Sequence, residues 1–320
     1  MRKLLVLAAS TALALGAAAC GGDDDDSGSA STSGGGSELS GNILIDGSST
    51  VAPLSEPAAE LFMEENPGVT IAVGTSGTGG GFEKFCNGET QISDASRQIE
   101  ADEEAACKKA GITYEELSVA NDALTVVVNP DNPVDCITVD QLKQIWEPKS
   151  KVSNWSQIDG LENAPDADLD LYGPGTDSGT FDYFTEAVNG EEGASRTDYN
   201  NVGEDDNSTV TGVSGSEGGM GYFGYSFYLE NQDSLKALEI DGGDGCVAPS
   251  PETVQDGSYV PLGRQLFIYP SGQALERPEV KSFVEFYIDN ATTIAEQAGF
   301  IGLTEEQVTE AKDKVAQLAG

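Results

Sequence analysis

The sequence predicts an α/β fold in which two lobes are joined by two chain crossings and leave a ligand cleft between them. Strand-like and helix-like segments alternate over residues 42–111, and a second alternating series covers residues 138–228. This alternation is typical of α/β units with a largely parallel sheet. A later apolar strand and two amphipathic helices indicate that the chain returns to the first lobe. A cleft between lobes is a usual place for a small ligand, and such lobes can close by hinging.

The N-terminal residues precede both lobes. Two basic residues, an apolar run over residues 4–15 and several small residues lead to Cys20, which is the pattern of an export signal. The apolar run is too short to cross a membrane. Because Cys20 follows three alanines, as in a bacterial lipobox, we expect a lipoprotein signal peptide over residues 1–19 and a lipidated Cys20. Ordinary cleavage near Ala19, without a lipid, is the alternative.

Residues 20–40 contain Gly, Asp, Ser and Thr and almost no apolar side chains after the cysteine. Such a segment buries too little surface to offset its ordering entropy. We therefore expect a flexible linker that tethers the folded part to the outer face of the cell membrane. The first lobe is expected at residues 41–128 and 262–320, and the second lobe at residues 129–261.

The first lobe is expected to begin with three strand–helix pairs. Its strands are short apolar runs bounded by turn residues, such as Asn66-Pro67-Gly68. Gly111 ends the third helix, a common position for glycine. We expect strands at residues 42–46, 69–73 and 92–96, and helices at residues 53–65, 82–87 and 103–110.

The second lobe follows a β-branched run at residues 123–128, and the proline-containing turn at 129–133 marks the first crossing. Its elements are expected as helices at 138–146 and 181–188, a strand at 169–172, and a strand followed by a helix within 219–228. The apolar strand at 266–269 is the expected return crossing. Two amphipathic helices, at 279–290 and 304–318, are expected to pack on the first lobe.

The formal net charge of −39 argues against nucleic acid and anionic lipid as partners, because both require clustered Lys and Arg. The chain contains no histidine, which excludes Ser–His–Asp and Cys–His catalytic groups. A phosphatase would need a metal cluster or an activated nucleophile, and no EF-hand spacing occurs. We therefore expect a binding protein that catalyses no reaction and holds no cofactor or metal.

Four cysteines remain if Cys20 is lipidated, and an even number in an exported chain indicates disulfides. Three connectivities are possible. We favour Cys86 with Cys107, which closes a local loop, and Cys136 with Cys246, which joins distant segments of the second lobe. A zinc site is the rival, and it is disfavoured because the chain has no histidine and no Cys-x-x-Cys pair.

Three Ser/Thr/Gly segments each open an expected helix: residues 47–51 (GSSTV), 76–81 (SGTGGG) and 173–180 (GPGTDSGT). A helix start offers unpaired backbone N–H groups and the positive end of the macrodipole, and small hydroxyl residues add donors. One such turn is weak evidence. Three of them predict a site in which neutral donors enclose a tetrahedral oxyanion, although the glycines of the second segment could form only a turn.

Longer motifs around these turns resemble the phosphate-binding proteins of bacterial phosphate ABC transporters. The motifs are GSSTVAPL, SGTGGGFEKFCNGETQISDASR and GPGTDSGTFDYF, and NDALTVVVNPDNP and GGMGYFGYSFYLEN fit the same family. They occur in family order over residues 42–300. The resemblance implies a two-lobed periplasmic-binding-protein fold of type II that clamps inorganic phosphate and delivers it to a membrane permease.

The resemblance also implies ligand residues in each turn. Carried over turn by turn, these are Ser49, Thr50 and the Val51 backbone, then Ser76 or Thr78, and then Ser178, Gly179 and Thr180. The glycines of the second turn leave the choice between Ser76 and Thr78 open.

The chain departs from well-known members of that family at two charged positions. Those members have an Asp after the Ser of the motif that reads ASR here, where this chain has Arg97, and an Arg where it has Pro174. We expect that the two charges have exchanged lobes. Arg97 of the first lobe would then donate two parallel charge-assisted hydrogen bonds to the anion, and Asp177 of the second lobe would supply a hydrogen-bond acceptor. Asp177 would accept the proton of monohydrogen phosphate, whereas sulfate carries no proton and would face an unpaired carboxylate.

Each of these charged residues has another interpretation. Asp177 could only cap the following helix, and Arg97 could pair with one of the many acids. Asp94 is a rival acceptor, although strand alternation would place it on the same face as Ser96 and opposite to Arg97. Arg264, near the return crossing, is expected to be structural.

The expected function is extracytoplasmic phosphate binding by a monomer that serves an ABC transporter permease. Two alternatives remain. The chain could bind another tetrahedral oxyanion, such as sulfate or molybdate, with neutral donors of the same kind. It could also be a surface sensor or adhesin that binds phosphate without serving a permease.

Overall fold

A computed structural model describes residues 39–318 of the chain. The strands are β1 (Gly41–Gly47), β2 (Val69–Gly74), β3 (Ile92–Ala95), β4 (Leu117–Val128), β5 (Cys136–Thr138), β6 (Asp170–Gly173), β7 (Asn200–Asn201), β8 (Gly219–Gly224), β9 (Lys236–Ala237), β10 (Glu239–Asp241), β11 (Cys246–Val247) and β12 (Gly263–Pro270). The helices are α1 (Ala52–Glu65), α2 (Thr78–Cys86), α3 (Ala101–Ala110), α4 (Val139–Trp146), the 3-10 helix η1 (Trp155–Gln157), α5 (Gly179–Asn189), α6 (Asp206–Gly215), α7 (Tyr225–Asn231), α8 (Pro251–Gln255), α9 (Gly272–Leu275), α10 (Pro278–Gln297) and α11 (Glu305–Leu318).

The main sheet has the strand order β2-β1-β3-β12-β4-β8-β6-β7, and β9 pairs with β4. The β2-β1-β3 pairings are parallel, as are β8-β6 and β6-β7, whereas β12 and β4 pair antiparallel with their neighbours. A small sheet, β11-β10-β5, lies in the second lobe. The predicted alternation of parallel strands and helices is therefore confirmed in each lobe, and the two long antiparallel strands, β4 and β12, are those that link the lobes.

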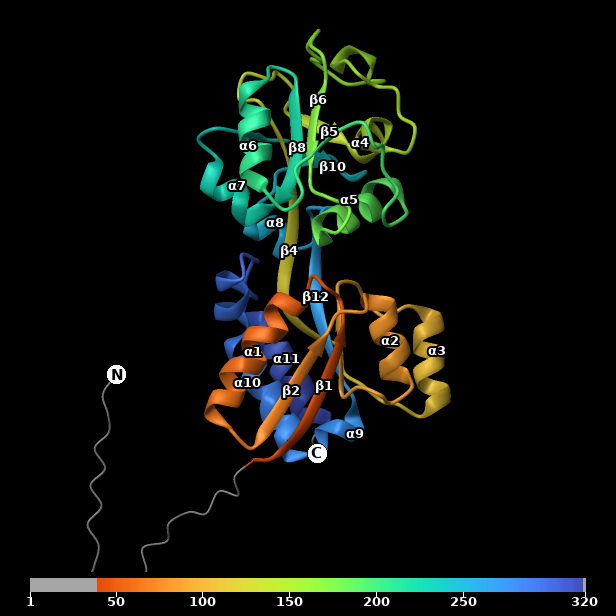
Figure 1. Cartoon of the computed structure of the whole chain (residues 1–320), viewed down its shortest axis with the longest axis vertical. Coiled ribbons are helices and arrows are strands. Elements are labelled where there is room, and N and C mark those ends of the chain that lie inside the picture. Colours follow the sequence, from red (N-terminus) through yellow and green to blue (C-terminus); the bar gives the residue numbers. More distant parts are fainter. Residues whose placement is uncertain (1–38, 319–320) are drawn as a thin grey trace, which may run out of the picture. The chain divides into compact units, whose positions relative to one another are not determined.

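Both faces of the first-lobe sheet are covered at its centre, where β3 and the second half of β12 are buried along their length, whereas β1 and β2 also have exposed residues. On β12, Leu266 and Ile268 pack in one core with α1 and α10, whereas Phe267 and Tyr269 pack with α2 in another. Successive side chains of a strand point to opposite faces, so each face receives alternate residues. Figure 1 shows α1 and α10 on one side of this sheet and α2 and α3 on the other.

The two lobes share β4 and β12, the two long strands that connect them in Figure 1. Within β4 the change of core falls between Ala120, in the first-lobe core, and Ala123, in the second-lobe core. Next to it, Leu262 belongs to the second-lobe core and Leu266 to the first. Both strands run without a break from one core to the other, so no single residue marks the border between the lobes. The predicted lobe limits, at residues 41–128, 129–261 and 262–320, therefore stay predictions.

The closing helices pack as expected. Phe283 and Tyr287 of α10 and Val315 of α11 are buried in the first-lobe core. Several predicted boundaries were wrong, among them the end of α10, which lies at Gln297 rather than at residue 290. The starts of two further elements were also wrong. Helix α2 begins at Thr78 rather than at residue 82, and β4 begins at Leu117 rather than at residue 123.

Each of these two errors has a physical cause. The α2 start is hidden by glycines with low helix propensity. Gly81 is required there because a methyl group on it would lie 2.5 Å from the Gly47 Cα. The β4 start is hidden by polar residues, which become buried through tertiary hydrogen bonds. Asn121 donates to the Gly302 carbonyl at 3.1 Å, and Arg264 donates to Asp122 at 3.2 Å.

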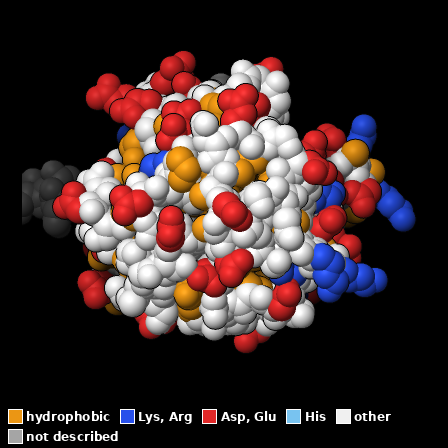
Figure 2. Space-filling model, turned by 90° about the horizontal axis from the view of Figure 1, so that it is seen from above, with side chains coloured by type: hydrophobic (Ala, Val, Ile, Leu, Met, Phe, Trp, Pro, Cys, Tyr) orange, Lys and Arg blue, Asp and Glu red, His pale blue; other side chains and the backbone are white. Residues whose placement is uncertain are grey.

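Carboxylates are spread over the face of the molecule drawn in Figure 2 rather than gathered in one patch. This distribution agrees with a solvated acidic surface, and the Lys and Arg side chains visible on that face lie mainly at its right-hand edge. No helix within residues 39–318 is long and apolar enough to cross a membrane. The predicted signal peptide, linker and lipidated Cys20 lie outside the described residues, apart from the last two linker positions.

Candidate functional site

The first Ser/Thr/Gly turn connects β1 to α1. The buried Ser48 anchors it, because its N–H donates to the Asp94 carbonyl at 2.9 Å and its hydroxyl accepts from the Thr50 N–H at 3.2 Å. The Val51 N–H donates to the Ser48 carbonyl at 3.2 Å. Ser49 is exposed and Thr50 half-buried, so their hydroxyls face outward from the start of α1.

The second turn connects β2 to α2 and touches the first, since the Gly77 N–H donates to the Gly47 carbonyl at 2.9 Å. Ser76 donates its hydroxyl proton to Asp46 at 2.6 Å. Thr78 accepts from the Ser96 N–H at 3.2 Å, and the two hydroxyls lie 3.0 Å apart. The hydroxyl proton of Ser76 is therefore committed to a carboxylate, whereas that of Thr78 can serve a ligand when Ser96 is the donor.

The third turn opens α5 from the second lobe. Ser178 is the N-cap residue and is buried, but its hydroxyl caps no N–H of the helix. Gly179 and Thr180 form the first turn of α5, where backbone N–H groups have no helical acceptor. Asp177 is exposed and precedes the N-cap position, so the helix-cap interpretation of this residue is wrong.

The first and third turns meet across the lobes. A methyl group built on Gly179 would lie 3.3 Å from the Thr50 hydroxyl and 3.9 Å from that of Ser49. Glycine is thus the residue that permits this approach. The start of α5 faces the start of α1, and the unpaired N–H groups of one oppose the hydroxyls of the other.

Arg97, predicted to supply a fork, is already paired with acids of its own lobe. Its Nη1 and Nη2 donate to the two Glu103 carboxylate oxygens at 2.8 and 2.9 Å, and its Nε lies 3.3 Å from Glu100. The Glu103 carboxylate raises the pKa of Arg97, and Glu186 of α5 adds to this effect. The guanidinium is near the second turn, because a methyl group on Gly79 would lie 3.9 Å from Nη2.

Arg264, expected to be only structural, lies at the first turn. Its Nε donates to Asp122 at 3.2 Å, and its Nη2 donates to the Thr50 hydroxyl at 3.3 Å. The guanidinium carbon lies 3.5 Å from the centre of the Tyr183 ring of α5. Sequence reasoning missed this placement because Arg264 and Thr50 are far apart in the chain, and no local motif links them.

Asp94 is ruled out as an acceptor for a cleft ligand. Its side chain is fully buried toward Ser55 and Tyr287, and burial raises its pKa to about 8. Ser96 instead contacts Thr78 of α2 on the other side of the sheet. The expected shared face of Asp94 and Ser96 was wrong because β3 ends at Ala95, so strand alternation does not continue to residue 96.

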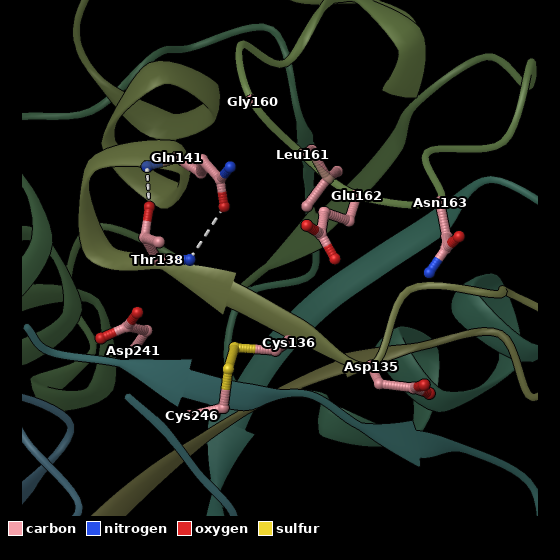
Figure 3. Close-up of a pocket in the computed structure, with 10 residues that line it drawn as sticks. All are labelled: Asp135, Cys136, Thr138, Gln141, Gly160, Leu161, Glu162, Asn163, Asp241 and Cys246. Atoms are coloured by element: carbon pink, nitrogen blue, oxygen red, sulfur yellow. Dashed lines mark hydrogen bonds between the residues drawn. A yellow bond between two sulfur atoms is a disulfide. The ribbon is translucent and has the colours of Figure 1, made fainter. Parts of the chain in front are cut away.

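The four remaining cysteines form the two favoured disulfides. Cys86–Cys107 joins α2 to α3, and Cys136–Cys246 joins β5 to β11. The second disulfide lies in a pocket of the second lobe together with Asp135, Glu162 and Asp241 (Figure 3). None of the three turns contributes to this pocket, and its carboxylates would repel an anion, so it is not the predicted site.

Comparisons with known proteins agree with this arrangement. A family model for the PBP superfamily domain matches residues 29–291. Protein SphX of Synechococcus elongatus is 47% identical over 275 residues, covering 85% of this chain and 80% of that protein. Phosphate-binding protein PstS of Staphylococcus saprophyticus is 39% identical over 283 residues, covering 88% and 86%. The crystal structure of a possible phosphate-binding protein from Planctomyces limnophilus superposes with a TM-score of 0.83 at 44% identity, covering 88% of this chain and 100% of that one.

Proposed function

This chain belongs to the PBP superfamily and to its branch of PstS-type phosphate-binding proteins, and on that premise we propose that it binds inorganic phosphate outside the cytoplasm and delivers it to the permease of a phosphate ABC transporter. Members of this family bind a substrate for transport. We further propose that this chain catalyses no reaction, acts as a monomer, and is attached to the outer face of the cell membrane only through a lipid on Cys20.

The observation that carries the proposal is the contact between the first and third turns across the lobes, with Gly179 against Thr50. A tetrahedral dianion at this junction would receive backbone N–H groups from the start of α5 and hydroxyls from both turns. Helix N-termini favour anions through their unpaired donors and their macrodipoles. Neutral donors of this kind suit an acidic protein, whose overall field does not attract anions.

The proposed ligand residues follow the three turns. They are Ser49, Thr50 and the Val51 backbone, Ser76 or Thr78, Asp177, and Ser178, Gly179 and Thr180. Within the second turn we favour Thr78, because the Ser76 hydroxyl proton is held by Asp46. We do not include Arg97, the guanidinium expected from the sequence, because both of its Nη atoms already donate to Glu103.

Asp177 is the proposed acceptor for the proton of monohydrogen phosphate. It is exposed and lies directly before Ser178, the N-cap residue of α5. Nearby, burial and the charges of Glu192, Asp177 and Glu186 raise the pKa of Asp182, so this end of α5 is already rich in carboxylates. A sulfate ion, which has no proton to donate, would add repulsion there without a compensating hydrogen bond.

The test is titration calorimetry of the mature protein without Cys20, stripped of bound anion, with phosphate and then with sulfate near neutral pH. One-to-one phosphate binding without a sulfate signal would support the proposal. Sulfate binding as tight as phosphate binding would point to another oxyanion. Binding of neither anion would contradict the proposed phosphate binding.

Transport itself needs a second test. Membrane vesicles that contain the transporter and are loaded with ATP should accumulate labelled phosphate only when the phosphate-loaded protein is added. Phosphate binding without any uptake would leave the binding proposal intact and favour the sensor interpretation.

A further inference from the structure

The described residues include four arginines, and they differ in how their guanidinium groups are used. Arg196 is buried and donates to Asp198 and to two backbone carbonyls. Arg277 pairs with Glu279 and donates to the Asn42 carbonyl. Neither contacts any of the three turns. Arg97 and Arg264 therefore remain as the guanidinium groups that could meet an anion at the proposed site.

Arg264 has donors to spare at that site. Its Nε and one Nη2 proton are used by Asp122 and Thr50, and its Nη1 has no hydrogen-bond partner within residues 39–318. In Arg97, by contrast, Nη1 donates to both Gln98 and Glu103, Nη2 donates to Glu103, and Nε faces Glu100. A guanidinium group carries five N–H donors, so Arg264 keeps three of them available.

The local charge also favours Arg264. Its single carboxylate partner is Asp122, and the pair is largely buried, with side-chain exposures of 14% and 11%. Arg97 faces two carboxylates, Glu100 and Glu103, and is influenced by Glu186 as well. A dianion placed beside Arg264 would meet a neutral pair, whereas one placed beside Arg97 would meet a group with net negative charge.

One face of α5 links Arg264 to the third turn. Tyr183, whose ring lies under the Arg264 guanidinium, follows Gly179 by one helical turn, so both residues point the same way. Tyr183 is fixed in place by its hydroxyl, which donates to the Pro261 carbonyl at 2.9 Å. The same face of the helix therefore presents backbone donors to Thr50 and an aromatic surface to Arg264.

We propose that Arg264, oriented by Asp122 and Tyr183, is the guanidinium group that contacts bound phosphate where the first and third turns meet, while Arg97 keeps its ion pair with Glu103. The inference rests on the proposed phosphate binding. It assigns Arg264 two roles: it contacts the anion, and it connects the first turn to α5 when the lobes are closed.

The experiment measures phosphate affinity by calorimetry and, separately, the melting temperature without phosphate. The variants are Arg264→Gln, Arg264→Lys, Arg97→Gln and, as a control for the loss of one positive charge, Arg277→Gln. A charge-assisted hydrogen bond is worth enough that Arg264→Gln should weaken phosphate binding about thirtyfold or more. Arg264→Lys should lose about tenfold, because lysine keeps the charge but not the planar fork. Arg97→Gln and Arg277→Gln should change affinity less than about threefold.

Arg264→Gln leaves Asp122 buried without its partner and could unfold the protein. The double variant Asp122→Asn with Arg264→Gln removes both charges, keeps the measurement possible, and should show the same loss of affinity. Wild-type affinity in Arg264→Lys and in the double variant would overturn the inference, as would a loss in Arg97→Gln as large as in Arg264→Gln. Absence of phosphate binding by the wild-type protein would instead contradict the proposed function.

Discussion

Asp177 carries the proposed selectivity of the site at the scale of a single residue. It is exposed and makes no cap for α5, so its position before Ser178 leaves the carboxylate available to a ligand. Asp177→Asn replaces an acceptor-only group with an amide that can also donate. The repulsion of sulfate would then disappear.

We therefore expect Asp177→Asn to bind sulfate measurably and to bind phosphate more weakly, which narrows the gap between the two anions by about tenfold or more. Calorimetry with both anions tests this expectation, and Asp166→Asn, at an exposed position of the second lobe, is a control acid. Unchanged selectivity in Asp177→Asn would remove Asp177 from the site.

Asp94 is expected to contribute to the pH dependence of stability. Burial raises its pKa to about 8, and Asp46 adds to the shift, so the folded protein holds a proton on a group that lies against Ser55 and Tyr287. The unfolded chain releases this proton above about pH 4. The contribution of Asp94 to the free energy of unfolding should therefore be greatest below about pH 4 and should fall as the pH rises toward 8.

Asp94→Asn should remove this pH dependence, because the amide cannot release a proton. Between pH 5 and pH 8, the unfolding free energy of the wild type should fall by up to about 1 kcal/mol more per pH unit than that of the variant. Urea denaturation at several pH values, with Glu64→Gln as an exposed control, measures the slopes. Equal slopes in wild type and Asp94→Asn would mean that Asp94 is ionised in the folded protein.

The start of α5 is the element on which the site depends most. Its glycine lets the helix approach the first turn, because any side chain at Gly179 would press on Thr50 at 3.3 Å. Gly179→Ala should weaken phosphate binding about tenfold while the isolated fold stays intact, since overpacking separates the two turns. Calorimetry and melting curves separate the two effects.

Gly215→Ala is the matched control for Gly179→Ala. A methyl group there would meet no heavy atom of the described residues within 4 Å, and the residue also lies in a second-lobe helix. It should keep the phosphate affinity of the wild type. Equal affinities in both variants would indicate that the turns stay farther apart when phosphate binds.

Elements with regular patterns were predictable, and those that depend on partners were not. The strands at 42–46 and 69–73 and the helix at 53–65 were located because apolar runs between turn residues carry local information. The first half of β4 was missed because Asn121 and Asp122 look like loop residues until Gly302 and Arg264 satisfy them. The short strands β7, β9 and β11 have too few residues to show any periodicity.

The whole molecule carries a net charge of −39, yet its proposed ligand is an anion. Long-range repulsion should slow the approach of phosphate, and salt should relieve it, because the Debye length falls from about 30 Å at 0.01 M to about 8 Å at 0.15 M ionic strength. The association rate of phosphate is therefore expected to rise with added sodium chloride over this range.

Stopped-flow mixing with a fluorescent label at the cleft measures this rate. Its increase with salt would mean that the site works by short-range hydrogen bonds against the field of the protein. A rate that falls with salt would instead reveal a local positive potential strong enough to steer phosphate, and the acidic surface would then be irrelevant to capture.

The sequence by itself determined the α/β class, the three helix-opening turns and the family resemblance. These features are local or carried by long contiguous motifs, so they can be read without knowing which segments meet. The tertiary structure decided what depends on distant partners. Arg97 is held by Glu103, Asp94 is buried, and Arg264 lies against Thr50 and Tyr183. A charged side chain has a role only once its neighbours are known, and folding alone brings those neighbours together.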